Sequence, residues 1–419
     1  VSATTGNYNT AIGREAFRTQ STASYNTGLG YRVGYANTTG QNNVFVGYAA
    51  GDNNTTGSFN TFLGTLAGDA NTEGASNVVV GYAAFDANTT GNNNTVVGTY
   101  TLTDNTTGTA NTAIGRQAGG SNTTGQYSTL IGYQAGYSQT TLGQNTHVGF
   151  QAGYYNTSAV NMTSIGYRAA QGAQGANTTA IGTQAMYSAG SGDANTAVGV
   201  NSLFANTSGS NNVGVGLQAL RFNTTGIRHV AIGNNTLYSN TSGNYGVAVG
   251  YEALKSDASV EESVAVGAFA LQSQTSGRNT AVGYAAGLDL TTGGYNTLLG
   301  GEAGENITTA SQNVAVGTHA LRYATTGATN TAVGYQAAYL TNNSGNTAVG
   351  FQALHQNSTG DSNVAIGYQA GYNYTSSNAT FIGYEAGEAV TTGGQNVGIG
   401  RRALQDTTTG SYNTAVGTY

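Results

Sequence analysis

Three aspartates recur at one position of a repeated phrase and are the best candidates for metal chemistry. Asp52, Asp69 and Asp86 lie 17 residues apart, and each begins an Asp-Xaa-Asn phrase. If the segments that carry them stack, the three carboxylates come within about 4.8 Å of one another and repel unless a cation lies between them. Oxygen ligands of this kind suit Ca²⁺. Two interpretations stay open, a calcium site or three hydrated aspartates in successive turns.

Aromatic residues recur with the same spacing, one residue after a glycine. Because Arg14 and Arg401 take this position in other repeats, we expect the column to face outward or to face a subunit boundary. Two interpretations are open, a stacking platform for sugars or a partner chain, and a ladder that stabilises only itself. The aromatic residues fall into two groups, Tyr335, Phe351, Tyr368 and Tyr384, and Tyr133, Phe150 and Tyr167.

Catalysis has little support in the sequence. The chain has no cysteine, which excludes thiol and disulfide chemistry. The four histidines, His147, His229, His319 and His355, fall in different columns or in distant repeats. A glycosidase would need two facing carboxylates, and no such pair can be placed. We therefore expect no enzyme and no cofactor other than the possible calcium.

The composition excludes other classes of partner. The formal net charge is −6, only 7% of the residues are charged, and Lys255 is the only lysine. Without a basic patch, binding to nucleic acid or to an anionic membrane is not expected. No apolar run approaches the roughly 20 residues that a membrane span needs. The first residues do not resemble a signal peptide.

An internal repeat organises the whole chain. Phrases such as Asn-Thr-Ala-Val-Gly end on a glycine, and these glycines run from Gly13 to Gly417 in 25 copies. Twenty of the 24 intervals are 17 residues long and four are 16. No change in composition marks a domain boundary. We therefore expect residues 1–419 to form a single continuous array, uncapped or part of a longer one.

The columns of the repeat predict an all-β fold. The residue before each glycine is Val, Ile or Leu, and the residue three before it is Thr or Val. This alternation has the period of a β-strand, and β-branched residues favour strands. We predict a parallel β-solenoid of about 25 coils with two or three short strands per coil. We expect both columns to line the interior, including Thr347, Val349, Val364 and Ile366.

Stacked coils also make predictions about polar residues. The asparagines of the turn phrases should form amide ladders from coil to coil. Two oppositely charged pairs share a column in adjacent coils and test the register: Glu15 with Arg32, and Glu385 with Arg402. We expect these to be exposed pairs of small energetic value.

The phrases Ser-Val-Ala-Val-Gly at 263–267, His-Val-Ala-Ile-Gly at 229–233 and Asn-Val-Ala-Ile-Gly-Tyr-Gln-Ala at 363–370 resemble known repeats. They are similar to the head repeats of YadA-like trimeric autotransporter adhesins, and more closely to the arrays of bacterial and phage tail-fibre-domain proteins. The resemblance covers essentially the whole chain. It implies a left-handed β-roll, a homotrimer, and a place outside the cell, on the cell surface or in a virion fibre. The 17-residue coil is longer than the adhesin repeat of about 14, which implies a wider cross-section.

The expected function is that of a non-enzymatic fibre that presents a repetitive surface to a cell-surface glycan or protein receptor. The alternative is a structural filament in which copies stack head to tail. A third possibility, an ice-binding solenoid, conflicts with the expectation that the Thr/Val column points inward.

Overall fold

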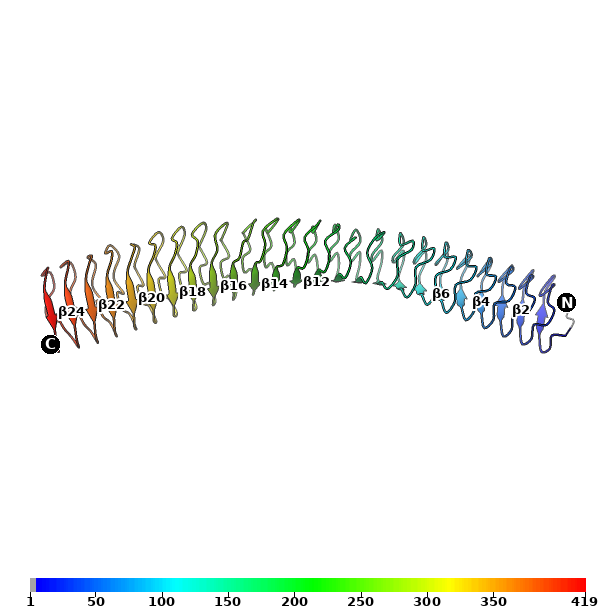
Figure 1. The fold of residues 1–419 in the computed structure, drawn as a ribbon, viewed down its shortest axis with the longest axis horizontal. Helices are drawn as coiled ribbons and strands as arrows, with labels where there is room; N and C mark the ends of the chain where they lie inside the picture. Colours follow the sequence, from blue (N-terminus) through cyan, green and yellow to red (C-terminus); the bar gives the residue numbers. More distant parts are fainter. Residues whose placement is uncertain (1–4) are drawn as a thin grey trace. The chain divides into compact units, whose positions relative to one another are not determined.

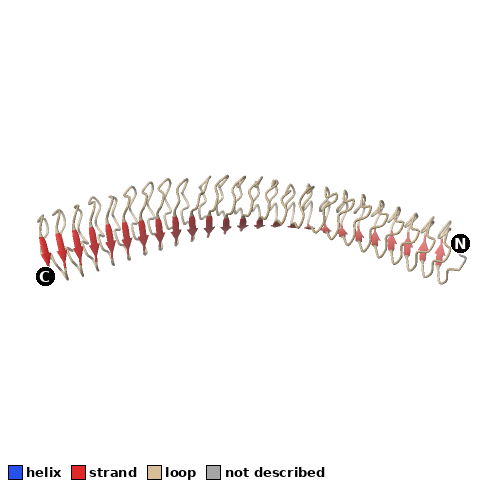
Figure 2. Cartoon of the chain, viewed as in Figure 1, coloured by secondary structure: helices blue, strands red, loops and turns tan. Residues whose placement is uncertain are grey.

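The repeats fold into a parallel β-solenoid. The structure, a computed structural model, describes residues 5–419 and divides into two compact units, Val1–Asn211 and Asn212–Tyr419. Within each unit, each coil contributes one strand of three residues, and each strand pairs in parallel with those of the coils before and after it (Figure 1). The solenoid prediction is confirmed. The expectation of two or three strands per coil is wrong, since the rest of each coil is turn (Figure 2).

The strands occupy the same place in every repeat. Those of the first unit are β1 (Thr10–Ile12), β2 (Thr27–Leu29), β3 (Val44–Val46), β4 (Thr61–Leu63), β5 (Val78–Val80), β6 (Thr95–Val97), β7 (Thr112–Ile114), β8 (Thr129–Ile131), β9 (Thr146–Val148), β10 (Thr163–Ile165), β11 (Thr179–Ile181) and β12 (Thr196–Val198). Those of the second unit are β13 (Val213–Val215), β14 (Val230–Ile232), β15 (Val247–Val249), β16 (Val264–Val266), β17 (Thr280–Val282), β18 (Thr297–Leu299), β19 (Val314–Val316), β20 (Thr331–Val333), β21 (Thr347–Val349), β22 (Val364–Ile366), β23 (Thr380–Ile382), β24 (Val397–Ile399) and β25 (Thr414–Val416).

The pairing register follows the repeat. Thr347 lies beside Val364, and Val349 beside Ile366, although other intervals are one residue shorter. In the pair β22–β23, 16 residues apart, Val364 still lies beside Thr380. The missing residue is therefore absorbed in the turns, and every strand presents the same side chains to the same side.

The repeat glycine is required by backbone geometry. Gly350 has a φ of +137°, which L-residues rarely adopt. A Cβ on Gly350 would lie 2.3 Å from the carbonyl oxygen of Gly367 in the next coil. The same close approach recurs at the other repeat glycines, so a side chain at this position would push successive coils apart.

The strand's middle residue, and not its two flanking residues, points into the solenoid. In β21 and β22 the middle residues Ala348 and Ala365 are fully buried. The flanking residues Thr347, Val349 and Val364 are partly exposed, and Ile366 is 39% exposed. The predicted inward placement of these four is wrong. The period of two was right, but its phase was wrong by one residue, and such a slip moves every side chain to the opposite face.

A second core position lies four residues after the repeat glycine, and its size compensates for that of the middle strand residue. Where the strand carries Ala248, the turn carries Leu254, and both are fully buried. Where the strand carries Phe381, the turn carries Gly387, and a Cβ there would lie 2.3 Å from the phenyl ring. Large residues thus share one narrow space. The same combination recurs in Phe45 with Gly51, Phe62 with Gly68, Leu130 with Gly136, and Leu298 with Gly304.

Asparagine ladders occupy the two ends of this narrow core. The predicted turn ladder is present where Asn71 donates to Asn54 (2.7 Å) and Asn88 donates to Asn71 (2.6 Å). A further ladder precedes the strands, where the backbone N–H of Asn43 donates to Oδ1 of Asn26 (2.9 Å). These amides satisfy buried backbone groups that have no strand partner.

Candidate functional surface

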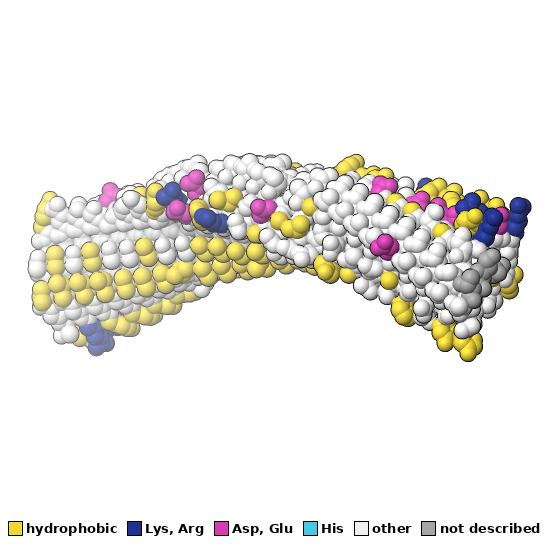
Figure 3. All heavy atoms as spheres, turned by 45° about the vertical axis from the view of Figure 1, so that its right-hand side comes forward, with side chains coloured by type: hydrophobic (Ala, Val, Ile, Leu, Met, Phe, Trp, Pro, Cys, Tyr) yellow, Lys and Arg dark blue, Asp and Glu magenta, His cyan; other side chains and the backbone are white. Residues whose placement is uncertain are grey.

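The two residues that flank each strand centre form the main exposed feature, which we call the outer columns. They hold Thr or Val three residues before the repeat glycine and Val, Ile or Leu one residue before it. Leu63 and Val78 are 46% and 42% exposed. Figure 3 shows rows of hydrophobic side chains that run along the surface of the second unit. Each unit therefore presents a flat β-sheet face whose residues repeat at the strand spacing.

The predicted aromatic column is present, and its rings stack on one another. Tyr335, Phe351, Tyr368 and Tyr384 lie in successive coils with ring centroids 5.1–5.4 Å apart and planes within 15° of parallel. Each ring is 41–44% exposed. The exposed parts are ring edges, because the faces cover each other.

The second aromatic group has the same geometry, and cations close its ends. Tyr133 stacks on Phe150 at 5.2 Å, and Phe150 on Tyr167 at 5.3 Å. The guanidinium of Arg116 lies 5.9 Å from the ring of Tyr133, and that of Arg168 lies 5.2 Å from Tyr167. Arg401 likewise lies 5.9 Å from the ring of Tyr384. Since neighbours cover the ring faces, this geometry favours a self-stabilising ladder over a platform on which sugars stack.

A second aromatic column, five residues after the repeat glycine, was missed from the sequence. His355 stacks between Tyr339 and Tyr372 with centroids 4.9 Å from each. Tyr137 and Tyr154 stack at 5.3 Å. Burial lowers the pKa of His355, which keeps its ring neutral in the stack. The column was hard to recognise because Asp, Arg and Gln take the same position in other coils, although its spacing was visible.

The three candidate calcium ligands share this column, but they are not equivalent. Asp52 is almost fully buried and accepts two hydrogen bonds from Arg32, to Oδ1 from Nε (3.2 Å) and to Oδ2 from Nη2 (2.7 Å). Burial, and then the charges of Asp52 and Asp86, raise the pKa of Asp69 to about 6. Burial also raises the pKa of Asp86. One carboxylate is thus neutralised by an arginine, and two are partly buried without a cation.

Within residues 5–419, no group of three or more His, Cys, Asp or Glu side chains is arranged to hold a metal ion. The pairing of Asp52 with Arg32 gives the physical reason for the aspartate column. The calcium assignment stays a prediction that metal titration must test.

The two register pairs behave differently. Nε of Arg402 lies 2.7 Å from the carboxylate of Glu385, as predicted. Arg32 instead turns toward Asp52, and Glu15 lies 3.5 Å from Arg18 in its own coil. Adjacent coils place several charges within reach, and the partly buried carboxylate attracts the arginine more strongly than an exposed one.

The histidines are distributed through the core and surface. His147 is fully buried at the strand centre of β9, and burial lowers its pKa to about 4. His229 is buried before β14 and accepts a hydrogen bond at Nδ1 from the N–H of Gly246 (3.0 Å). His319 lies 3.1 Å from Glu302 on the surface. These positions serve packing, since each ring has its own separate environment.

Comparisons with known protein families and with curated proteins find no match. The resemblance to adhesin heads and tail-fibre arrays stays a prediction that rests on the repeat phrases. In the described part of the chain, no helix has the length and apolarity that crossing a bilayer requires.

Proposed function

We propose that the protein is a non-enzymatic structural fibre whose outer columns pack against copies of the same chain. The observation that carries this proposal is the sheet face itself, on which β-branched and aliphatic side chains repeat in every coil. Monomeric soluble proteins rarely expose contiguous apolar patches larger than a few hundred Å². A face of this kind in each unit is therefore an interaction surface.

A second copy is the partner that fits this face best. Strands in neighbouring coils are about 4.8 Å apart, so a partner must present side chains at the same period along its whole length. A second copy has that period by construction. If each coil exposes roughly 100 Å² on the outer columns, 12 coils would bury about 1,200 Å² per partner, more than the ~800 Å² per side of a standard interface.

The resemblance to adhesin heads and tail fibres favours a homotrimer, located outside the cell, at its surface or in a virion. In that assembly the aromatic edges and turns stay exposed and present the repetitive surface to a glycan or protein receptor. The head-to-tail filament is the alternative assembly. It would leave the outer columns exposed and would join copies through their terminal coils.

The oligomeric state tests the proposal. Sedimentation equilibrium or native mass spectrometry should find a trimer for the wild-type chain. Val349→Lys with Ile366→Lys should give monomers, because two charges would be buried in the interface. Thr392→Lys, at an exposed turn position in the same unit, should stay trimeric. A wild-type monomer would overturn the proposal, and open-ended threads in electron micrographs would replace it with the filament.

The outward orientation of the Thr column supports ice binding as a second candidate. From β6 to β12, seven successive strands place Thr at the first position and Val or Ile at the third, all on the outer face. The sequence argument against ice binding assumed that this column points inward, which is wrong. An assay of ice recrystallisation inhibition tests this candidate. Thr129→Tyr should abolish the inhibition, whereas Thr124→Tyr, at an exposed turn, should keep it.

A further inference from the structure

The second aromatic column is interrupted at Gly120, and the interruption opens a hollow in the surface. The next two coils carry Tyr137 and Tyr154 at this position, stacked within 9° of parallel. Gly120 has no left-handed φ, so its backbone conformation does not require glycine, unlike that of the repeat glycines. What glycine provides here is an absent side chain, and with it a gap in one layer of the stack.

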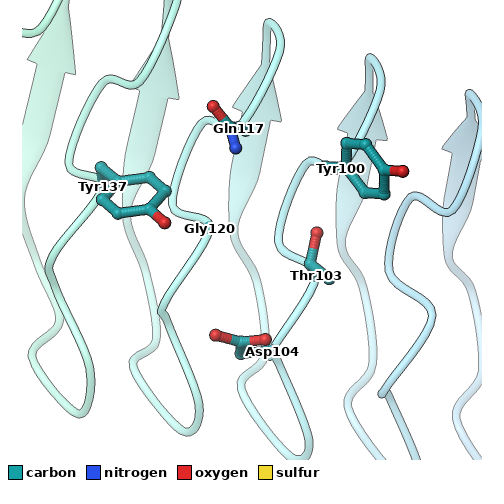
Figure 4. A pocket seen from close by; sticks show the side chains of 6 residues that line it. All are labelled: Tyr100, Thr103, Asp104, Gln117, Gly120 and Tyr137. Carbon is teal, nitrogen blue, oxygen red and sulfur yellow. The ribbon is translucent and has the colours of Figure 1, made fainter.

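The hollow, which we call the Gly120 notch, has a volume of about 220 Å³. In Figure 4 the side chains of Tyr137 and Tyr100 lie on the two sides of the coil that carries Gly120. This volume is below the ~300–1,000 Å³ of sites for drug-sized ligands, which limits the notch to a single ring. Its lining residues are Tyr100, Thr103, Asp104, Gln117, Gly120 and Tyr137.

One wall of the notch is aromatic. One face of Tyr137 packs on Tyr154, and its ring leans over Gly120, since a Cβ on residue 120 would lie 2.8 Å from Cε2 of Tyr137. The side chain that would cover the other face of Tyr137 in a continuous column is missing. The aromatic ladders described above bury their ring faces, whereas this ring has a face open to a ligand.

The other walls are polar and hold hydrogen-bonding groups. Asp104 is exposed at the rim, where its backbone N–H donates to the carbonyl of Gly120 (3.1 Å). Oε1 of Gln117 accepts from Gln134 (3.0 Å), which fixes the amide and leaves its nitrogen on the side of the notch (Figure 4). Oγ1 of Thr103 is buried and has no hydrogen-bond partner within the described residues. A buried hydroxyl of this kind gains by binding a ligand or water.

We propose that the Gly120 notch binds one neutral sugar ring. The C–H face of a pyranose would lie on the open face of Tyr137, where the weakly positive C–H groups meet the negative face of the ring. Its hydroxyls would donate to the Asp104 carboxylate and accept from the Gln117 amide. The guanidinium of Arg116, close enough to Tyr100 to act on its ionisation, disfavours a cationic ligand. The notch lies in the turns, outside the outer columns, so binding does not depend on the assembly state.

Saturation-transfer difference NMR on the full chain tests the site. The probes are the methyl glycosides of β-D-glucose, β-D-galactose and N-acetyl-β-D-glucosamine, with tyramine as a cationic ring. At least one glycoside should bind with a Kd of about 1 mM, the affinity that one ring supports. Gly120→Tyr continues the column and should weaken this binding at least tenfold. Asp104→Asn should weaken it about fivefold or more.

The matched control is Asp289→Asn, which changes the equivalent residue of another coil and should leave binding unchanged. The proposal is overturned if no glycoside binds at about ten times the expected Kd, or if binding survives Gly120→Tyr in a folded protein. It is also overturned if tyramine alone binds and is lost in Asp104→Asn, because the site would then select cations. Should Gly120→Tyr fail to fold, Asp104→Asn and Thr103→Val still decide the question.

Discussion

Exchanging the sizes of Phe381 and Gly387 should reveal how strictly the two core positions compensate each other. Phe381→Ala removes a fully buried phenyl ring at the centre of β23 and should cost about 3–5 kcal/mol of local stability. Gly387→Leu alone forces a side chain against that ring, because a Cβ already lies 2.3 Å from it. Overpacking of this kind should cost at least about 2 kcal/mol.

The double variant should be more stable than the sum of these losses implies. It recreates the combination of Ala248 and Leu254, in which Leu is accepted at a φ of +50°. A residual cost of at most about 3 kcal/mol is expected from the left-handed backbone at residue 387 and the lost contact between Tyr374 and Phe381. Two single losses of at least about 5 kcal/mol in total then give a favourable coupling of at least about 2 kcal/mol.

Hydrogen exchange followed by mass spectrometry is the suitable assay, because a solenoid loses stability locally and a single unfolding free energy is not defined for it. Peptides from residues 364–404 report on the exchanged pair, and peptides from residues 247–271 serve as an internal reference. Phe381→Leu is the mild control, since Leu130 and Leu298 already occupy this position. A double variant whose loss equals the sum of the single losses within about 0.5 kcal/mol would refute size compensation.

Three further predictions follow from backbone geometry and burial. Gly350→Ala should destabilise its coil by at least about 3 kcal/mol, whereas Gly301→Ala, whose Cβ meets open space, should be nearly neutral in the same exchange assay. His147 has a pKa lowered to about 4, so its unfolded form takes up a proton first as pH falls below about 6.5; His147→Leu should remove about 3 kcal/mol of acid sensitivity between pH 6.5 and 4, measured by exchange at both pH values. Asp69 has a pKa raised to about 6, so its native form loses stability as pH rises from about 3.8 through 6; Asp69→Asn should therefore raise the melting temperature at pH 8 and leave it unchanged near pH 3.5.

The solenoid was predictable because its repeat is fixed by contacts that recur in every coil. The glycine spacing defines the register, since only glycine tolerates both the backbone angle at Gly350 and the approach of Gly367. The inner and outer sides were not assigned correctly, because β-branched residues suit either face of a strand. The compensating sizes of Phe381 and Gly387 were visible in the sequence and would have identified the buried column.

The candidate sites were less predictable, because they depend on which of several nearby side chains pair. Arg32 shares a column with Glu15 yet pairs with Asp52 in the following coil. Register alone places all three within reach and does not choose among them. The Gly120 notch depends on the absence of a side chain between two particular coils, and its glycine is one of 65 in the chain.

Core and surface changes are largely separable in this fold, and that separation determines where function can reside. Each strand has one inward side chain, and the turn position that packs with it compensates for its size, so the core tolerates Phe381 or Ala248 without altering the outer columns. The outer columns nevertheless keep Thr or Val and Val, Ile or Leu in every coil, although no core packing requires this. A surface without such a constraint would vary in polarity, as the turns do. A regular apolar face that the fold itself does not need is best explained by contact with another chain of the same period.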